Sequence, residues 1–442
     1  MSELNKFDSW INEGGPAALV IREQLEPVEG PDGVFFPATF AAEQGNDPDR
    51  FRGGYHIDQF PDGTNVCLVD TVGSQGNRIE PIFMAGDYAK LVPQVVITAG
   101  DKRFSILEAG HRSADAIVRC SVLKNDLELA FKEVLKGNAK PLAQIAPTSL
   151  VFGVWDSRGT YAKLPRLVSS TIRAFNVYRH KRHAQYNPVA HFKNEGLLDG
   201  IEASDDDLAE KGYVSQPIGK QPTGKTDPTH GGVQLMPNGS IRRDATLSLA
   251  ALRRLAVRES NGALLTEQTQ ALRHYILGLA LVALTAEQDT YLRQGCNLVP
   301  TKEGNSRTFK VVHPSGKRDD YTLTPGDAKK YAEAAATAFG VGKNREEPFD
   351  KKLAERDIKG EDAGNIQKYQ ACEVVMFDVE ANTFTLKTTV DGNVQEIAVS
   401  TTADTKFKKG RSNKTFEELV RLGAKLDVEL SNGVALKITG KN

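Results

Sequence analysis

The feature that most constrains this chain is a run of 38 residues, 157–194, that contains no aspartate or glutamate. Its basic residues are Arg158, Lys163, Arg166, Arg173, Arg179, Lys181, Arg182 and Lys193, with His180, His183 and His191. Aromatic residues are interleaved with them, at Tyr161, Phe175, Tyr178, Tyr186 and Phe192. Because cations neutralise phosphates and aromatic faces stack on unpaired bases, the mixture is typical of a surface for single-stranded nucleic acid. The alternative is a solvated basic helix face.

The rest of the composition is that of an ordinary folded protein without a net charge bias. The 442 residues include 56 basic and 57 acidic ones, so any anion binding depends on local asymmetry. This length allows two or three domains. Four widely spaced cysteines match neither a zinc spacing nor a disulfide framework, which favours a reducing cytosol. The first residues do not form a secretory signal, and the most apolar segment, 275–286, is too short to span a bilayer. We therefore expect a cytoplasmic protein.

The pattern of apolar segments and turn residues predicts an α+β fold. Strands are expected at 17–24, 65–70, 94–98 and 149–155, and helices near 79–91, 113–123, 167–181, 244–258 and 267–286. A hairpin is expected to turn at 314–317. Thr324, Pro325 and Gly340 are typical of the start and end of one further helix.

The chain is predicted to divide into a core over residues 1–340, a charged linker over 341–370 and a small β-rich domain over 371–442. The last region has five short strands with one helix, near 416–422, between the third and fourth, which suggests an OB-like or other small β-barrel. Within the core, residues 195–210 carry seven acids and no base. They are interpreted as a solvated loop or as a charge-complementary subunit contact.

Residues 219–226, GKQPTGKT, satisfy the P-loop pattern for nucleotide phosphates. That mechanism needs a helix that begins at the second glycine, whereas Pro228, Gly231 and Gly232 would break such a helix within two turns. A nucleotide-dependent enzyme is therefore kept only as the least favoured alternative.

Other catalytic patterns are weak. His180 and His183 could lie on one helix face, but a metal site needs further ligands that the neighbourhood lacks. We expect no catalytic residue, no metal and no cofactor.

Three segments together resemble a known family. They are TVGSQGNRIEP (71–81), the block APTSLVFGVWDSRGTYAKLPRLVSSTIRAFNV (146–177) with AQYNP (184–188), and GSIRRDATLSLAALRRL (239–255), extended by matches at 272–284 and 292–299. The set resembles the crRNA-binding backbone subunit of type I-G (formerly I-U) CRISPR Cascade complexes. This subunit is a Cas-seven-type member of the RAMP superfamily. The resemblance covers about residues 15–300 and leaves out the β-rich tail.

The resemblance implies an RRM-like, ferredoxin-type palm with finger and thumb insertions. It implies a non-catalytic subunit whose copies oligomerise along crRNA and hold the guide for pairing with target DNA in antiviral defence. Its partners would be further copies of itself, a large subunit and a fused crRNA-processing and capping subunit, with no membrane contact. Related type III backbones cut target RNA with a loop aspartate. Cleavage by Asp156 or Asp244 is therefore the main alternative, although no motif supports either residue.

A guide held by its backbone requires cations for the phosphates and leaves the base edges free. The main candidates for RNA binding are Arg158, Lys163, Arg166 and Arg173, followed by Arg242 and Arg243. Arg78 is a weaker candidate that could be a structural ion-pair partner. Tyr186 is a candidate for stacking on a base, and the Gly-rich segment 212–240 for the thumb or finger.

Overall fold

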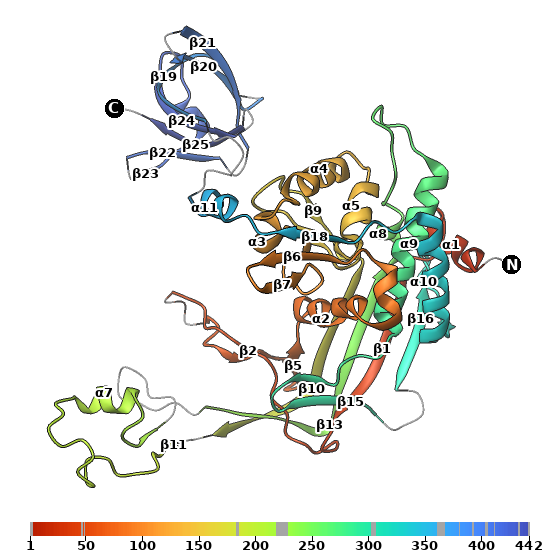
Figure 1. Ribbon diagram of the computed structural model, residues 1–442, viewed down its shortest axis with the longest axis vertical. Coiled ribbons are helices and arrows are strands. Elements are labelled where there is room, and N and C mark those ends of the chain that lie inside the picture. Colours follow the sequence, from red (N-terminus) through yellow and green to blue (C-terminus); the bar gives the residue numbers. More distant parts are fainter. Residues whose placement is uncertain are drawn as a thin grey trace. The chain divides into compact units, whose positions relative to one another are not determined.

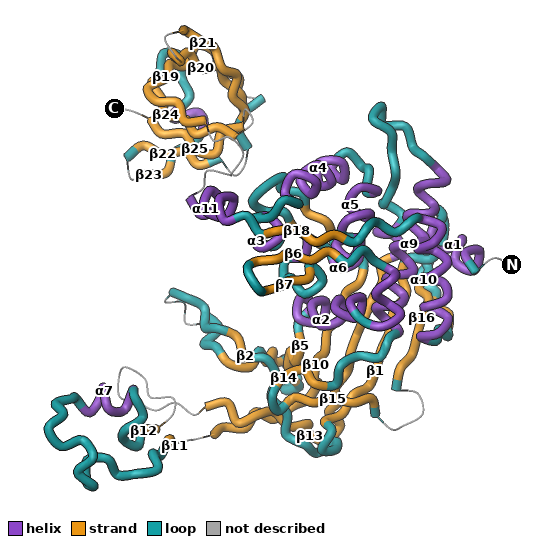
Figure 2. Tube along the Cα trace, in the orientation of Figure 1, coloured by secondary structure: helices purple, strands orange, loops and turns teal. Residues whose placement is uncertain are grey.

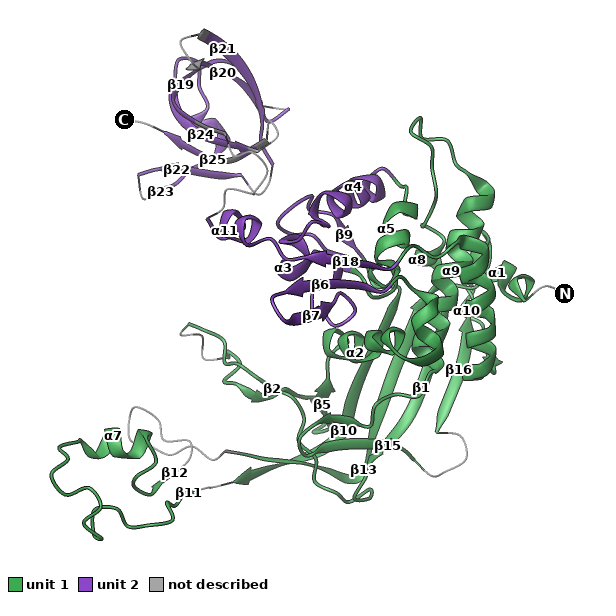
Figure 3. Cartoon of the chain, viewed as in Figure 1, with its two compact units in different colours: residues 1–93, 137–153, 165–343 green, residues 94–136, 154–164, 344–442 purple. Residues whose placement is uncertain are grey.

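The computed structural model describes residues 3–45, 47, 49–182, 185–217, 229–301, 306–359, 367–379, 381–390, 393–402, 405–410, 412–431 and 434–440. The chain forms two compact units, each assembled from separate stretches of sequence (Figure 3). Unit 1 contains residues 1–93, 137–153 and 165–343, and unit 2 contains residues 94–136, 154–164 and 344–442. The acid-free run therefore contributes to both units.

Unit 1 contains a curled antiparallel sheet that forms half of a barrel (Figure 1). Its strand order is β14-β15-β1-β13-β10-β5-β4, and the hairpin β16–β17 also pairs with β1. The bounds are β1 Ala18–Pro27, β4 Ile57–Gln59, β5 Asn65–Asp70, β10 Val168–Arg182, β13 Thr229–Ser248, β14 Tyr291–Arg293, β15 Cys296–Pro300, β16 Arg307–Val312 and β17 Arg318–Tyr321.

Helices cover one face of this sheet (Figure 2). Their bounds are α1 Asp8–Ile11, α2 Val72–Ile79, α5 Lys140–Ile145, α6 Pro147–Phe152, α8 Leu249–Leu252, α9 Thr266–Thr285 and α10 Pro325–Phe339. The central helix α9 is almost wholly buried, and it approaches α10 closely because Gly278 has no side chain. A Cβ atom at Gly278 would lie 2.8 Å from the Cα atom of Ala332.

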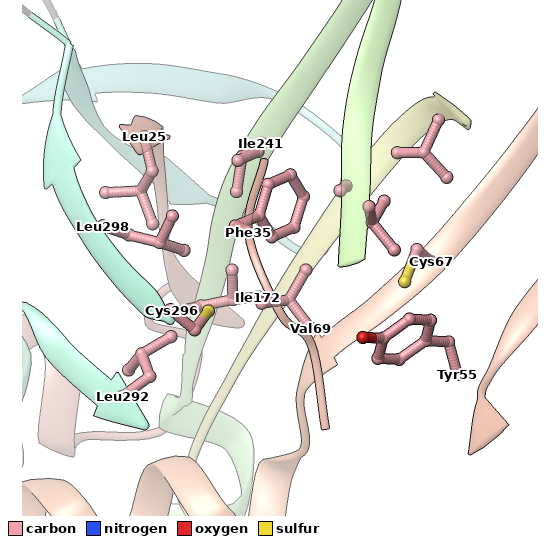
Figure 4. Packing of buried hydrophobic residues seen from close by; sticks show 13 residues of the cluster. Leu25, Phe35, Tyr55, Cys67, Val69, Ile172, Ile241, Leu292, Cys296 and Leu298 are labelled. Atoms are coloured by element: carbon pink, nitrogen blue, oxygen red, sulfur yellow. The ribbon is translucent and has the colours of Figure 1, made fainter. Parts of the chain in front are cut away.

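Successive side chains of a strand point to opposite faces, so each central strand has an inner face toward the helices and an outer face. On β1, Leu19, Ile21, Glu23 and Leu25 are buried, and the residues between them are more exposed. The lower part of the inner face forms an apolar cluster in which Phe35 and Ile241 pack near Cys296 (Figure 4).

The remaining elements of unit 1 are short. They are the 3-10 helices Leu4–Phe7, Glu80–Met84 and Gly86–Leu91, the strands β2 Thr39–Phe40, β3 Gly54–Tyr55, β11 Gln185–Tyr186 and β12 Gln216–Pro217, and helix α7 Asp205–Glu210. The acidic segment 195–210 thus includes α7, which begins at Ser204 as N-cap.

Unit 2 contains a three-stranded sheet, two helices beside it and a short hairpin. The sheet has the order β18-β6-β7, with β6 Val95–Ala99, β7 Lys102–Ser105 and β18 Arg345–Pro348, and β18 runs parallel to β6. The helices are α3 Ala116–Arg119 and α4 Lys124–Leu135, after a 3-10 turn at Arg112–Ala114. The hairpin joins β8 Val154–Trp155 to β9 Lys163–Leu164.

The C-terminal part of the chain forms a separate mixed sheet of order β21-β20-β19-β24-β25-β22-β23. Its elements are β19 Gln367–Asp378, β20 Thr383–Val390, β21 Asn393–Ser400, β22 Lys406–Lys409, β23 Ser412–Asn413, α12 Phe416–Leu419, β24 Lys425–Ser431 and β25 Val434–Gly440. The five predicted strands, and the helix between the third and fourth of them, are confirmed. Part of the charged segment before it forms β18 and helix α11, Lys351–Lys359.

Several other predictions are confirmed, including the strands at 17–24 and 65–70, the helix at 267–286 and the hairpin that turns at 314–317. Helix α10 begins as predicted, because the Thr324 side chain accepts a hydrogen bond from the Asp327 backbone N–H. In the described part of the chain, no helix is both long and apolar enough to cross a membrane.

Five predicted elements differ from the structure. In place of the helix predicted near 79–91 the chain has the 3-10 helices Glu80–Met84 and Gly86–Leu91, and in place of the one at 113–123 it has the 3-10 turn Arg112–Ala114 and the single turn α3. Residues 167–181 form strand β10 rather than a helix, because the segment is rich in β-branched residues (Val168, Thr171, Ile172 and Val177) and pairs with β13 and β5. Residues 149–155 are mostly helix α6, which begins at Pro147 and ends where Gly153 takes a positive φ of 77°. The region 244–258 is first the end of β13 and then only the single turn α8.

Candidate nucleic-acid interface

The outer face of the unit 1 sheet carries a row of cations. Arg173 on β10 lies directly opposite Arg242 on β13, and Arg22 on β1 lies opposite Asp244. The Asp244 carboxylate pairs with both Arg22 (Nε to Oδ1, 3.4 Å) and Arg242 (Nε to Oδ2, 3.0 Å). Two arginines are thereby held side by side on the face that helices do not cover. The Arg22 side chain is 62% exposed, so phosphate oxygens can reach its guanidinium.

An aromatic ring belongs to the same face. The Arg242 guanidinium carbon lies 4.7 Å from the centre of the Phe175 ring, which is a cation–π contact. Arg173 donates a hydrogen bond from Nη1 to the Thr171 hydroxyl, at 2.8 Å. The contacts of Arg242 with Phe175 and of Arg173 with Thr171 leave further guanidinium N–H groups of both arginines available. The face therefore combines cations with a half-buried aromatic side chain, which suits single-stranded nucleic acid.

Arg243 lies on the other face of the sheet, although it follows Arg242 directly. Its side chain is 3% exposed and forms an ion pair with Glu23 (Nε to Oε2, 2.7 Å), and Arg307 donates to Oε1 of the same carboxylate at 2.6 Å. Burial lowers the pKa of Arg243; Glu23 opposes this shift, and the neighbouring Arg307 adds to it. Arg243 is a structural member of an Arg–Glu–Arg group on the inner face.

Arg78 also lies on the inner side, in a second ion network. The fully buried Asp70 carboxylate accepts hydrogen bonds from Gln75 (2.7 Å), Arg78 (3.3 Å) and Arg293 (2.5 Å). A cavity of about 140 Å³ is lined by residues of both networks, among them Glu23 and Arg78. Arg78 is therefore an ion-pair partner of Asp70, which is the alternative that the sequence offered for it.

Beyond the sheet, β10 and β13 continue as a two-stranded basic ribbon. The pairing shifts at Asn176, whose φ is +55°, and resumes between Val177 and Leu235. Arg179 contacts His230 (Nη2 to Nδ1, 3.2 Å). Burial, with the charge of Arg179 beside it, lowers the pKa of His230. The ribbon therefore carries exposed cations next to an imidazole whose protonation is disfavoured.

Tyr186 lies past the ribbon, in the small β11–β12 pair, where its ring is partly exposed and close to Gly212. Nearby, Lys193 pairs with Asp205 at the start of α7, so the acidic segment neutralises part of the basic run. The structure does not bring Tyr186 into contact with any other predicted site residue in the described part of the chain.

Arg158 and Lys163 lie in the β8–β9 hairpin of unit 2, and both are exposed. The Lys163 ammonium lies 5.1 Å from the centre of the Trp155 ring. Arg166, just after the hairpin but part of unit 1, is also exposed. The residues predicted to bind RNA are thus divided among the outer sheet face, the inner face and the hairpin.

The two carboxylates considered for RNA cleavage both have structural partners. Asp156 is buried and accepts hydrogen bonds from the Gly159 N–H (3.2 Å), the Thr160 N–H (2.6 Å) and the Thr160 hydroxyl (2.7 Å). Asp244 pairs with Arg22 and Arg242, as described above. Both oxygens of each carboxylate are therefore occupied by hydrogen-bond or ion-pair partners within the chain.

The remaining sequence patterns are described only in part. His180 contacts Gln234 (Nε2 to Oε1, 3.0 Å), whereas His183 and the P-loop-like residues 219–226 lie outside the described residues. Among the residues that the structure describes, no group of three or more His, Cys, Asp or Glu side chains is placed to hold a metal ion.

Sequence reasoning missed Arg22 and Trp155. Arg22 is an isolated base within ALVIREQ, and only its register opposite Asp244 brings it to Arg242. Trp155 ends a segment that reads as a buried strand, but it is 57% exposed. A signal for Trp155 did exist, since only Asp156 separates it from the acid-free run.

Comparison with known families gives one match. Residues 19–179 match the family model of CRISPR-associated protein GSU0053. The match begins in β1 and ends in β10, so it includes Arg22 and Arg173 but not Arg242. No curated protein matches the chain. The matched region is therefore similar to CRISPR-associated proteins.

Proposed function

We propose that this chain is the crRNA-binding backbone subunit of a type I-G CRISPR Cascade complex and acts in antiviral defence without catalysing a reaction. Copies of the chain bind one guide RNA side by side and leave its bases free to pair with target DNA. The large subunit and the crRNA-processing subunit complete the assembly. The match of residues 19–179 to a CRISPR-associated family supports a role in CRISPR defence. The cations on the outer sheet face support RNA as the ligand.

The observation that carries this proposal is the row Arg22, Arg242 and Arg173 on a sheet face without helices. Phosphates bound there would be neutralised by side chains that come from three adjacent strands. Such a surface contacts the backbone of the nucleic acid rather than its base edges, which a guide requires. The half-buried Phe175 offers a ring edge or face to one nucleotide.

The chain order of the sheet supports an RRM-like, ferredoxin-type palm. When β4, β5, β14 and β15 of the same sheet are left aside as additions, β1 is followed in unit 1 by helices, then by the paired strands β10 and β13, then by α9 and β16. This is the strand–helix–strand–strand–helix–strand order of that fold. The long β10–β13 ribbon and the segment at its end are the finger or thumb insertion in this proposal.

The proposal is tested by expressing the chain with a CRISPR array and the other Cascade subunits. We expect the protein to co-purify with RNA of uniform length, bound by several copies. Recovery of RNA of random length and sequence, in amounts that follow the total cellular RNA, would show a nonspecific basic surface and overturn the proposal.

An RNA-cleaving backbone is the second candidate, although Asp156 and Asp244 are each already held by other partners, Thr160 and Arg242 among them. Incubating the assembled complex with matched RNA and magnesium decides between the two. Intact RNA supports the non-catalytic subunit, whereas fragments at regular intervals that disappear in the Asp156→Asn or Asp244→Asn variant establish cleavage. Micromolar ATP binding abolished by Lys225→Ala would instead support the nucleotide-dependent enzyme.

A further inference from the structure

The β8–β9 hairpin of unit 2 presents a tryptophan to solvent. The chain has two tryptophans. Trp10 is 6% exposed, whereas Trp155 is 57% exposed. An indole ring is large and apolar, so exposing more than half of it is costly unless a ligand covers it.

One face of the Trp155 ring already has a partner. Lys163 is the residue directly opposite Trp155 in the hairpin, and its ammonium lies 5.1 Å from the ring centre. A cation on one face leaves the other face free for a flat ligand. The positive charge also favours a ligand that carries phosphate.

The hairpin is held rigidly from inside. The buried Asp156 accepts three hydrogen bonds from Gly159 and Thr160, and the Asp156 N–H donates to the Ala162 carbonyl at 2.9 Å. Burial lowers the pKa of Arg119, but Asp357 and the charge of Asp156 raise it overall, so this cation helps to balance the buried carboxylate. A Cβ atom at residue 159 would lie 2.7 Å from that carboxylate, which fixes glycine there.

The turn also holds a second aromatic residue in an unfavourable backbone conformation. Tyr161 has a φ of +59° and is 61% exposed, next to the buried Ala162. A bulky side chain in this region is strained, and such strain concentrates at binding sites. Arg158 is exposed in the same turn, and the only acid between residues 154 and 164, Asp156, is buried.

We propose that Trp155 stacks on an unpaired nucleobase of single-stranded RNA, with Lys163 on the opposite face of the ring. Arg158 contacts a neighbouring phosphate, and Tyr161 offers a second ring. The choice of RNA rests on the proposed function, whereas the stacking site rests on the hairpin alone. A preformed aromatic platform of this kind binds any base, because every base has a π-face.

The test is tryptophan fluorescence of the full chain during titration with a short unstructured RNA. Because Trp10 is buried, the difference between the wild-type protein and the Trp155→Phe variant isolates the emission of Trp155. We expect RNA to quench this emission. Inorganic polyphosphate, a polyanion without bases, should bind without quenching it.

Affinity provides the second measurement. Trp155→Ala should weaken RNA binding about tenfold, since stacking on one base is worth roughly 1–3 kcal/mol. Trp155→Phe should retain most of the affinity. Tyr291→Ala, which truncates an aromatic residue that is also exposed but lies outside the hairpin, should bind normally and is the matched control.

RNA that binds with wild-type affinity to Trp155→Ala and leaves Trp155 emission unchanged would overturn the stacking site but not the proposed function. Equal quenching by polyphosphate would show a charge effect and also overturn it. Absence of any RNA binding by the wild-type protein would overturn both proposals.

Discussion

Two neighbouring arginines on β13 have opposite environments. Arg242 lies on the outer face beside Phe175 and Asp244, whereas Arg243 is buried on the inner face against Glu23. The same residue type at consecutive positions is thus buried in an ion pair on one side of the sheet and lies on the outer face on the other. The difference shows that a cation's function depends on the strand face it occupies, and a run of basic residues cannot by itself reveal that face.

The inner face should respond to mutation through stability and the outer face through RNA binding. A buried ion pair that loses one partner leaves the other charge uncompensated at low dielectric. Removing an exposed cation costs the protein little stability. It does remove one contact with a phosphate, and with it the release of a counterion on binding. The predictions below test this division.

The largest effect is expected for Glu23→Gln. This change leaves Arg243 and Arg307 without their shared carboxylate and should lower the free energy of unfolding by about 3 kcal/mol. Urea unfolding followed by Trp10 emission, in a Trp155→Phe background, reports on unit 1. Glu26→Gln, on the same strand but not buried, should change stability little. Equal stability of the two variants would mean that the buried group is dispensable.

The next effect concerns alkaline pH and the thiols of the inner core. Burial raises the pKa of Cys67 to about 12 and that of Cys296 to about 11, from an ordinary value of 9.0. Above pH 9 the unfolded state therefore loses these protons first, and the free energy of unfolding falls as pH rises. The loss should approach about 1.4 kcal/mol per pH unit for each thiol.

Unfolding measured from about pH 8 to about pH 11 checks this prediction. The Cys67→Ala, Cys296→Ala double variant should show a flatter pH dependence than the wild type. Both thiols should also resist iodoacetamide near pH 8 until the protein unfolds. Rapid native-state labelling of either thiol would contradict the burial of this core.

A smaller effect is expected for the Arg173→Ala, Arg242→Ala double variant on the outer face. If one copy neutralises about five phosphates, log K should fall with log salt at a slope near −3.5. Removing two contacts should make the slope less steep by about 1.4. The double variant Lys132→Ala, Lys136→Ala removes the same charge from α4 and is the control. Equal slopes for the two double variants would place the RNA elsewhere.

The smallest effect is expected for Asp244→Asn. This change removes the one carboxylate beside Arg22 and Arg242, so phosphate repulsion falls and RNA affinity should rise a few-fold at low salt. Filter binding with a short RNA measures it. Weaker binding would show instead that Asp244 contributes mainly by positioning the two arginines.

Elements with strong local signals were predictable. The cap residues around α10 and the turns between the C-terminal strands specify their structure within a few residues. Strand β10 was not predictable in this way, because its basic residues suggested a solvated helix and its pairing partners lie on distant segments. Trp155 was read as part of a buried strand, since the break at Gly153 separates it from α6 only in the folded chain.

The amino-acid sequence alone determined that positive charge and aromatic residues are concentrated in one acid-free segment, and that a β-rich region follows residue 371. Only the tertiary structure decided which cations of the sheet are buried in ion pairs and which lie on its outer face. The reason is strand register: Glu23 meets Arg243, and Asp244 meets Arg22, across more than 200 residues of sequence. Adjacent side chains on a strand point to opposite faces, so a single position in the register separates the buried Arg243 from Arg242 on the outer face.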